Sequence, residues 1–261
     1  MNLGSRTASL AAGLVVTTLA LLLTASAASA SDWSWTITPY AWATDVGVNA
    51  KVADREIVDE EIAVGDLLED LDTIVQLRLD VQHGQYGLAL DLFDVTLSDQ
   101  VSGVALPENA GEAALDSDMG MTILDVAGLF DPKGDKQGVS FLYGVRVLNE
   151  RATVDATFLL DSGSSTGRYE TEDTFVDGLV GIRLTKRFSR HWSYQMQADL
   201  STGGTDYTWS AGPSIAYAFG QSGRYSLTAG YRRMEVNFEE DGELNTEMTL
   251  SGVLVGLRLS Y

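Results

Sequence analysis

Alternation of apolar and polar side chains with a period of two residues is the strongest constraint that this sequence places on its fold. Between residues 192 and 200, every even-numbered residue is apolar and every odd-numbered residue is Ser, Gln or Asp. The same alternation runs through 74–82, 139–147, 207–219 and 249–261. Successive side chains of a strand point to opposite faces, whereas an apolar helix face repeats every three to four residues, so these windows predict β-strands.

About ten strands are predicted in this way, separated by turns that alternate in length. The strands are expected near 33–44, 73–83, 86–98, 119–130, 139–150, 174–187, 191–202, 206–219, 224–237 and 247–261. Longer connections are expected at 45–72, 99–118 and 151–173. Eight or twelve strands remain open, and a hairpin within the segment 46–64 would make twelve. The alternation changes phase near Phe93 and Asp94, which predicts a β-bulge there.

The face opposite the apolar one decides between a soluble β-sandwich and a membrane barrel. That face is mostly Gly, Ser, Ala, Thr and Gln with scattered charges, which suits the inside of a narrow barrel better than a solvated sheet. Aromatic residues gather towards strand ends, as in the girdles of membrane barrels. They are Trp33, Trp35, Tyr40, Trp42, Trp192, Tyr194, Tyr207, Trp209, Tyr217 and Phe219. The prediction is an all-β, single antiparallel transmembrane β-barrel.

Residues 1–30 have the pattern of a secretory signal peptide. Arg6 precedes an apolar run at 10–23, and Ala28, Ser29 and Ala30 fit the small-residue rule for cleavage. A membrane anchor is the alternative, although the run is short for a membrane-spanning helix. We therefore expect a cleaved leader at 1–30 and an outer-membrane barrel at 31–261.

Composition excludes several functions. With 37 acidic and 17 basic residues the net charge is −20, which disfavours nucleic-acid binding, since phosphate contacts need clustered Lys and Arg. The sequence has no cysteine and only two histidines, which removes thiolate metal sites and makes a multi-histidine metal centre improbable. No cofactor and no metal site are predicted.

Charged residues on the polar phase of the strands are the candidate functional residues. A charge that faces lipid is costly, so these side chains should point into the lumen and pair with one another. They are Arg78, Asp80, Arg146, Asp177, Arg183, Asp199, Arg232 and Arg258, joined on a weaker pattern by Asp91 and Asp125. Two interpretations remain open, a salt-bridged plug and a charged constriction that selects small solutes.

Enzymatic chemistry has little support. Most enzymes among outer-membrane barrels need a histidine beside Ser, Asp or Glu to activate a nucleophile or water, and both His83 and His191 fall in short turns at the predicted periplasmic rim. Ser189 near His191 forms a dyad by sequence only.

The segment 45–72 carries ten acidic residues and suits a solvated external loop. Divalent-cation binding is the alternative, but the segment lacks the spacing of a calcium loop. Within it, 66–71 predicts a short helical cap.

The C-terminal hexapeptide 256–261 resembles the β-signal that the barrel-assembly machinery recognises in Gram-negative outer-membrane proteins, with Gly256, Leu259 and Tyr261 in the signal positions. The chain also resembles a broad group of uncharacterised proteobacterial outer-membrane barrels, in the segments 35–42, Asp199 with 203–204, and 230–232. The resemblance implies insertion into the outer membrane of a Gram-negative bacterium, beside its lipids and lipopolysaccharide. We expect a monomer with a structural or interaction role, or narrow passage of small solutes; the alternative is an enzyme acting on lipid A or phospholipid.

Overall fold

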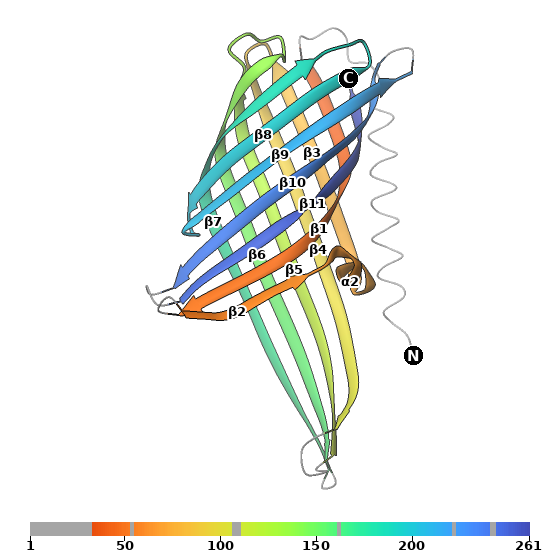
Figure 1. The fold of residues 1–261 in the computed structure, drawn as a ribbon, viewed down its shortest axis with the longest axis vertical. Helices are drawn as coiled ribbons and strands as arrows, with labels where there is room; N and C mark the ends of the chain where they lie inside the picture. The colour runs from red at the N-terminus through yellow and green to blue at the C-terminus, as the bar shows by residue number, and fades with distance from the viewer. Residues whose placement is uncertain (1–32, 53–54, 106–110, 161–162, 221–222, 241–243) are drawn as a thin grey trace. The chain divides into compact units, whose positions relative to one another are not determined.

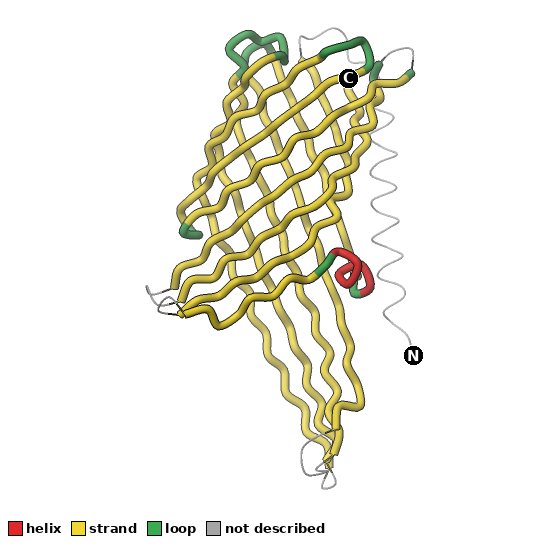
Figure 2. Tube along the Cα trace, viewed as in Figure 1, coloured by secondary structure: helices red, strands yellow, loops and turns green. Residues whose placement is uncertain are grey.

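The computed structural model describes residues 33–52, 55–105, 111–160, 163–220, 223–240 and 244–261, so the predicted signal peptide lies outside the described residues. The chain forms a closed antiparallel barrel with ten wall strands (Figures 1 and 2). The elements are β1 (Trp33–Val52), β2 (Arg55–Ile62), α2 (Val64–Glu69), β3 (Leu71–His83), β4 (Tyr86–Ala105), β5 (Gly111–Phe130), β6 (Gly138–Leu160), β7 (Gly163–Arg187), β8 (Trp192–Gly203), β9 (Tyr207–Phe219), β10 (Tyr225–Glu240) and β11 (Leu244–Ser260). The predicted fold class is confirmed.

Each strand from β3 to β11 pairs with its sequence neighbours, and β11 pairs with β1 to close the wall. The closing register runs from Thr36 opposite Ser260 to Val52 opposite Leu244. Beyond it, Trp35 and Tyr261 exchange two backbone hydrogen bonds of 2.9 and 3.0 Å. Closure leaves no unpaired wall edge in the hydrocarbon, where an unsatisfied backbone group is costly.

The strands are longer than the alternation predicts on one side of the barrel. The expected loops 99–118 and 151–173 are mostly the paired continuations of β4–β5 and β6–β7, which project beyond the other strands (Figure 1). The turns at the opposite end are short, such as the one at 84–85 between β3 and β4. Short turns are periplasmic in outer-membrane barrels, so the long hairpins lie on the external side.

The segment 46–64 forms a hairpin but adds no wall strand. β2 pairs with the external part of β1, from Val46 to Val52, and β3 takes its place beside β1 nearer the periplasm. The expected helical turn is the six-residue α2, two residues earlier than predicted. Asp45 Oδ1 accepts a hydrogen bond of 2.8 Å from the Val64 backbone N–H, which satisfies one free donor at the start of α2.

The predicted bulge near Phe93 and Asp94 is wrong, because β4 pairs there without a register shift with both β3 and β5. The phase change has another cause. Inward residues of β4 pass from Asp91 to the buried Phe93, while outward residues pass from Leu92 to Asp94. The strand stays regular, and its two faces exchange polarity at one level.

The same exchange occurs on other wall strands. On β10, Tyr231 faces outward and is followed on that face by Arg233, while inward Arg232 is followed by Met234. Outward polar residues at this level are register partners of their neighbours: Asp94, Thr122, Asn149 and Thr174 on β4 to β7, and Asp45, Ser251 and Arg233 on β1, β11 and β10. On these seven strands, the polar residues mark the external limit of the lipid-facing surface.

An apolar belt lies on the outside of the wall on the periplasmic side of these polar residues. Its exposed residues include Val139, Phe141, Tyr143, Val145, Val176, Val180, Ile182, Met196, Leu200, Ile215, Leu227, Tyr231, Val253, Val255 and Leu257. A belt of this kind on a closed barrel contacts membrane lipids and places the protein in the outer membrane. Among the described residues, no helix is long and apolar enough to cross a membrane.

Aromatic residues form a girdle mainly at the periplasmic edge of the belt. The exposed members include Trp35, Tyr86, Phe188, Trp192, Tyr217, Phe219 and Tyr225. The expectation that Tyr40 and Trp42 belong to a girdle is wrong, since both lie on the inward phase of β1 and Trp42 is only 2% exposed. The sequence alone does not show whether an aromatic residue at a strand end faces lipid in a girdle or points into the lumen, because an apolar lumen filling also accepts aromatic side chains.

Candidate functional site in the barrel lumen

The first group of lumen charges lies on the inward faces of three strands. Arg78 Nη2 of β3 donates to Asp91 Oδ2 of β4 at 2.6 Å, and Arg232 Nη1 of β10 reaches the same oxygen at 3.4 Å. The Tyr40 hydroxyl of β1 donates to Asp91 Oδ1 at 2.7 Å. One carboxylate thus joins opposite sides of the wall, and its lone pairs are satisfied by charged or hydroxyl donors.

A second group centres on Arg146, whose side chain is 1% exposed. Its Nε and Nη2 donate to the two oxygens of Asp125 at 2.7 and 2.8 Å, a bidentate arrangement. Nη2 also donates to Asp199 Oδ1 at 2.8 Å, and the Ser210 hydroxyl lies 2.9 to 3.0 Å from both Asp199 oxygens. The group carries two carboxylates and one guanidinium, all removed from solvent.

Arg183 joins the second group to the periplasmic part of the lumen. Its Nη1 donates to Asp80 at 2.7 Å and its Nε donates to Gln197 at 3.0 Å. Gln197 Nε2 in turn donates to Asp199 at 3.3 Å. Arg183 and Asp80 therefore join the Arg146 group in one network that spans β3 and β5 to β9. Among the described residues, no hydrogen bond links this network to the Asp91 group.

Asp177 lies on the inward face of β7 but takes no part in the ion pairs. Its carboxylate accepts hydrogen bonds from the backbone N–H groups of Gly204 and Thr205 and from the hydroxyls of Ser201 and Thr205, at 2.6 to 3.0 Å. It fixes the tight β8–β9 connection. Sequence spacing places this residue on the correct face but does not reveal that role.

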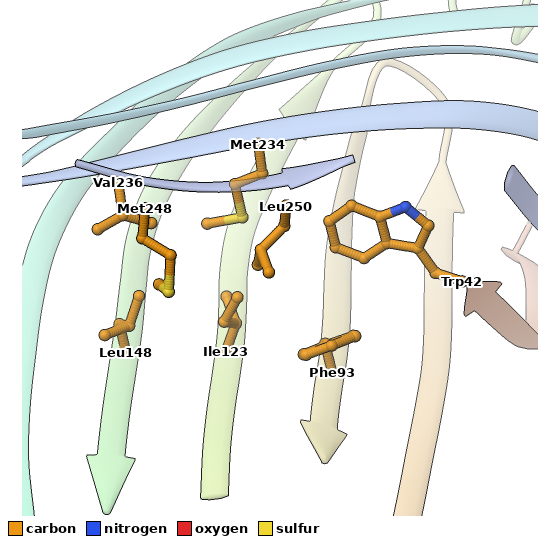
Figure 3. Close-up of a cluster of buried hydrophobic side chains, with 8 residues drawn as sticks. All are labelled: Trp42, Phe93, Ile123, Leu148, Met234, Val236, Met248 and Leu250. Carbon is orange, nitrogen blue, oxygen red and sulfur yellow. The ribbon is translucent and has the colours of Figure 1, made fainter. Parts of the chain in front are cut away.

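An apolar plug occupies the lumen on the external side of the ion pairs, and sequence reasoning missed it. The plug consists of Trp42, Phe93, Ile123, Leu148, Met234, Val236, Met248 and Leu250. Side chains from β1, β10 and β11 meet side chains from β4, β5 and β6 across the lumen (Figure 3). Arg232 lies 4.9 Å from the centre of the Trp42 ring, so the ionic and apolar layers are in contact.

The space left inside the wall is small at the level of the ion pairs. A cavity of about 60 Å³ lies among residues such as Tyr40, Arg78, Ser210 and Arg232, which suffices for a few water molecules but not for a solute. A larger cavity of about 460 Å³ lies at the periplasmic end, bordered by Asp80, Arg183 and Arg258. Arg258 Nη2 is 3.5 Å from Gln195 Oε1, and no carboxylate of the described chain forms an ion pair with it.

The residues of the C-terminal signal lie at the closing seam. Gly256 pairs with Tyr40, and a Cβ atom on Gly256 would lie 2.9 Å from the Tyr40 Cβ, which is too close. Glycine therefore makes room for the tyrosine that donates to Asp91. Leu259 pairs with Ile37 and Tyr261 bonds to Trp35, so the last residues fasten β11 to β1.

The histidines lie at the short-turn end as predicted, without the arrangement of a catalytic dyad. His191 Nδ1 lies 3.0 Å from the Ala218 carbonyl oxygen, and its ring contacts Tyr217. The Ser189 hydroxyl accepts the backbone N–H groups of His191 and Trp192, at 3.2 and 3.0 Å. Both side chains thus stabilise the turn. Within the described part of the chain, no cluster of three or more acidic or histidine residues is placed to hold a metal ion.

Comparison with known proteins relates the fold to outer-membrane barrels. No family model and no curated protein sequence matches the chain. Among solved structures, the outer membrane protease OmpT of Escherichia coli is similar with a TM-score of 0.54 at 8% identity, over 90% of this chain and all of that one. The translocator domain of the autotransporter NalP of Neisseria meningitidis is similar at 0.32 and 11% identity, over 98% and 97% of the two chains. At such identities the likeness concerns the fold.

Proposed function

We propose that this protein is a non-conducting outer-membrane barrel that serves as a structural and interaction protein at the cell surface. The observation that carries the proposal is the apolar plug on the external side of the two groups of ion pairs. Ions and polar solutes cross a membrane through hydrated paths, and a dry hydrocarbon layer across the lumen opposes them. Narrow passage of solutes is therefore the less favoured of the two roles that the sequence allows.

The external strands suit contact with a partner. β4 to β7 extend as paired strands beyond the lipid belt, and most of the charged side chains described there are acidic. These acids are Asp99, Asp116, Asp118, Asp155, Glu170, Glu172 and Asp173. A partner with a cationic surface, or lipopolysaccharide bridged by divalent cations, is complementary to such a surface.

The rest of the proposal concerns assembly and enzymatic activity. The barrel is inserted as a monomer by the barrel-assembly machinery, which reads Gly256, Leu259 and Tyr261. It has no enzymatic activity, because both histidines lie at the periplasmic end and His191 contacts the Ala218 carbonyl oxygen instead of a nucleophile. Hydrolysis of lipid A or phospholipid by the purified protein, abolished by His83→Ala or His191→Ala, would support the enzyme alternative instead.

Planar-bilayer recording tests the closed lumen. The wild-type protein, shown to be folded by its heat-modifiable migration on gels, should give no steady single-channel steps. Met234→Gly combined with Leu250→Gly removes two side chains from the plug without touching the ion pairs, and should produce small conductance steps. Steady conductance of the wild-type protein would overturn the proposal and favour the solute-passage role.

A further inference from the structure

The 460 Å³ cavity at the periplasmic end has the volume of a small-molecule ligand site. Its walls are the inward faces of the strands, including Asp80 of β3, Arg183 of β7 and Arg258 of β11. Arg258 and Gln195 also border the 60 Å³ cavity that lies among the ion pairs, so the larger space ends where the network begins. Ligand sites of small molecules occupy about 300 to 1,000 Å³, and this cavity lies within that range.

The charge of the cavity opposes the charge of the chain. Seven charged side chains border it, of which five are cationic: Lys136, Arg183, Arg187, Arg224 and Arg258, against Asp80 and Asp135. The whole sequence has 37 acidic and 17 basic residues. Repulsion among cations that lie close together is unfavourable, so the excess of cations over carboxylates attracts an anion that enters the space.

Arg258 is the least satisfied cation of the lumen. Its Nε is buried and has no hydrogen-bond partner among the described residues, and its one polar contact is the 3.5 Å approach to Gln195. Asp80, the nearby carboxylate, already accepts Arg183 at 2.7 Å. Burial of a guanidinium whose N–H donors lack acceptors lowers the stability of the fold unless another group accepts their hydrogen bonds.

The turn at 131–137 holds a further cation at the mouth of the cavity. The buried Asp131 accepts the backbone N–H groups of Lys133 and Lys136, at 3.0 and 2.7 Å, and the Gln82 side chain at 3.3 Å. These bonds fix Lys136 in a left-handed conformation with φ of 58°. Desolvation lowers the pKa of the Lys136 amine, which indicates that its charge is partly removed from water.

We propose that this cavity binds a small polyanion with carboxylate or phosphate groups, which enters from the periplasm. Arg258 takes one anionic group at the inner end of the cavity and Lys136 takes another at the mouth. The apolar plug closes the lumen above, so the site is a blind receptor pocket on the periplasmic side of the barrel. It is independent of the external interaction role, because the two surfaces lie at opposite ends of the wall.

Titration calorimetry with two probes tests the site. Citrate and inorganic pyrophosphate are titrated separately into protein extracted from outer membranes in a non-ionic detergent at low salt. We expect at least one probe to bind with a Kd below about 1 mM. Raising the ionic strength should weaken binding, since part of the attraction is screened over about 10 Å. Preference for citrate or pyrophosphate identifies a carboxylate or a phosphate ligand.

Variants assign the binding to this cavity. Arg258→Met should weaken the binding about tenfold or more, and Lys136→Gln should weaken it less, since charge-assisted hydrogen bonds contribute more when buried. Arg168→Met is the matched control, because Arg168 is an exposed arginine near Asp155 and Glu170 on the external hairpin. It should leave the affinity unchanged.

Two results would overturn the inference: no heat with either probe up to about 10 mM, a concentration that reveals even a weak site, or equal affinities for the wild type, Arg258→Met and Lys136→Gln. Heat-modifiable migration shows whether each variant is folded. If Arg258→Met does not fold, Lys136→Gln decides alone, because Lys136 lies in a turn outside the barrel wall.

Discussion

Arg232 and Met234 are consecutive residues on the inward face of β10, and the filling of the lumen changes from ion pairs to hydrocarbon between them. Arg232 reaches Asp91 at 3.4 Å, while Met234 is completely buried in the apolar plug. On the outward face of the same strand, Tyr231 faces lipid and Arg233 is half-exposed beside Glu235. Inside and outside thus exchange polarity at the level where the strand leaves the membrane.

The position of that level can be tested with two arginine substitutions on the outward face of β11. Val255→Arg places a charge in the apolar belt and should destabilise the barrel by about 2–4 kcal/mol. Thr249→Arg, six residues nearer the external end, should change stability by less than about 0.5 kcal/mol, as surface substitutions do. Reversible urea unfolding in lipid vesicles measures both. Equal losses for the two variants would refute the proposed boundary.

The ion-pair network predicts a difference between breaking and replacing it. Arg146→Met leaves Asp125 and Asp199 buried without their cation and should cost about 3–5 kcal/mol of folding stability. Adding Asp125→Asn and Asp199→Asn removes the uncompensated charges and should restore most of that loss. The same unfolding measurement compares the variants.

Loss of the exposed Arg168 and Asp155 pair is the control for the network, and should change stability by no more than about 1 kcal/mol. A triple variant that is no more stable than Arg146→Met would contradict this account, since it would mean that charge compensation is not what Arg146 provides.

How far the sequence determines this fold depends on the phase of its alternation. Residues 207–219 keep one phase throughout, so both the strand and its lipid-facing residues are predicted correctly. On β4, the polarity exchange between Asp91 and Asp94 has the same sequence pattern as a bulge, because a shifted register and an inverted environment both move apolar residues to the other face. The external parts of β4 to β7 are predicted as loops for the same reason, because their alternation no longer places apolar residues on the outward face.

The lumen residues could be assigned to a face but not to partners. The period of two places Arg146 and Asp199 inside, although they are 53 residues apart and belong to β6 and β8. Which carboxylate meets which guanidinium depends on the shear of the closed wall, which the sequence does not display. Met234 is hidden because the polar outward residue Glu235 follows it, so that it looks like the end of a lipid-facing strand. Trp42 is hidden because an aromatic residue near a strand end also fits an interfacial girdle.

Asp177 provides a test of a single polar anchor. Asp177→Ala removes four hydrogen bonds to residues 201–205, which should cost about 2–4 kcal/mol. The Thr205 backbone N–H loses its acceptor, whereas that of Gly204 keeps the Val176 carbonyl oxygen at 3.0 Å. Asp177→Asn retains one oxygen and should lose less. We expect a protease added from the external side to cleave the β8–β9 connection faster in Asp177→Ala than in the wild type. Equal cleavage rates would show that the connection is held by other contacts.

The apolar plug should contribute to stability as a soluble protein core does. Met234→Ala removes a fully buried side chain at the centre of the plug, and should destabilise the barrel by about 2–5 kcal/mol through lost burial and the cavity left behind. Met196→Ala is the matched control, since Met196 lies in the apolar belt and is 42% exposed on the outside of the wall. Its truncation exchanges contacts with lipid and should cost less than about 1 kcal/mol. If the urea concentration at the midpoint of unfolding were the same for both variants and the wild type, the external part of the lumen would be hydrated and the plug would not close it.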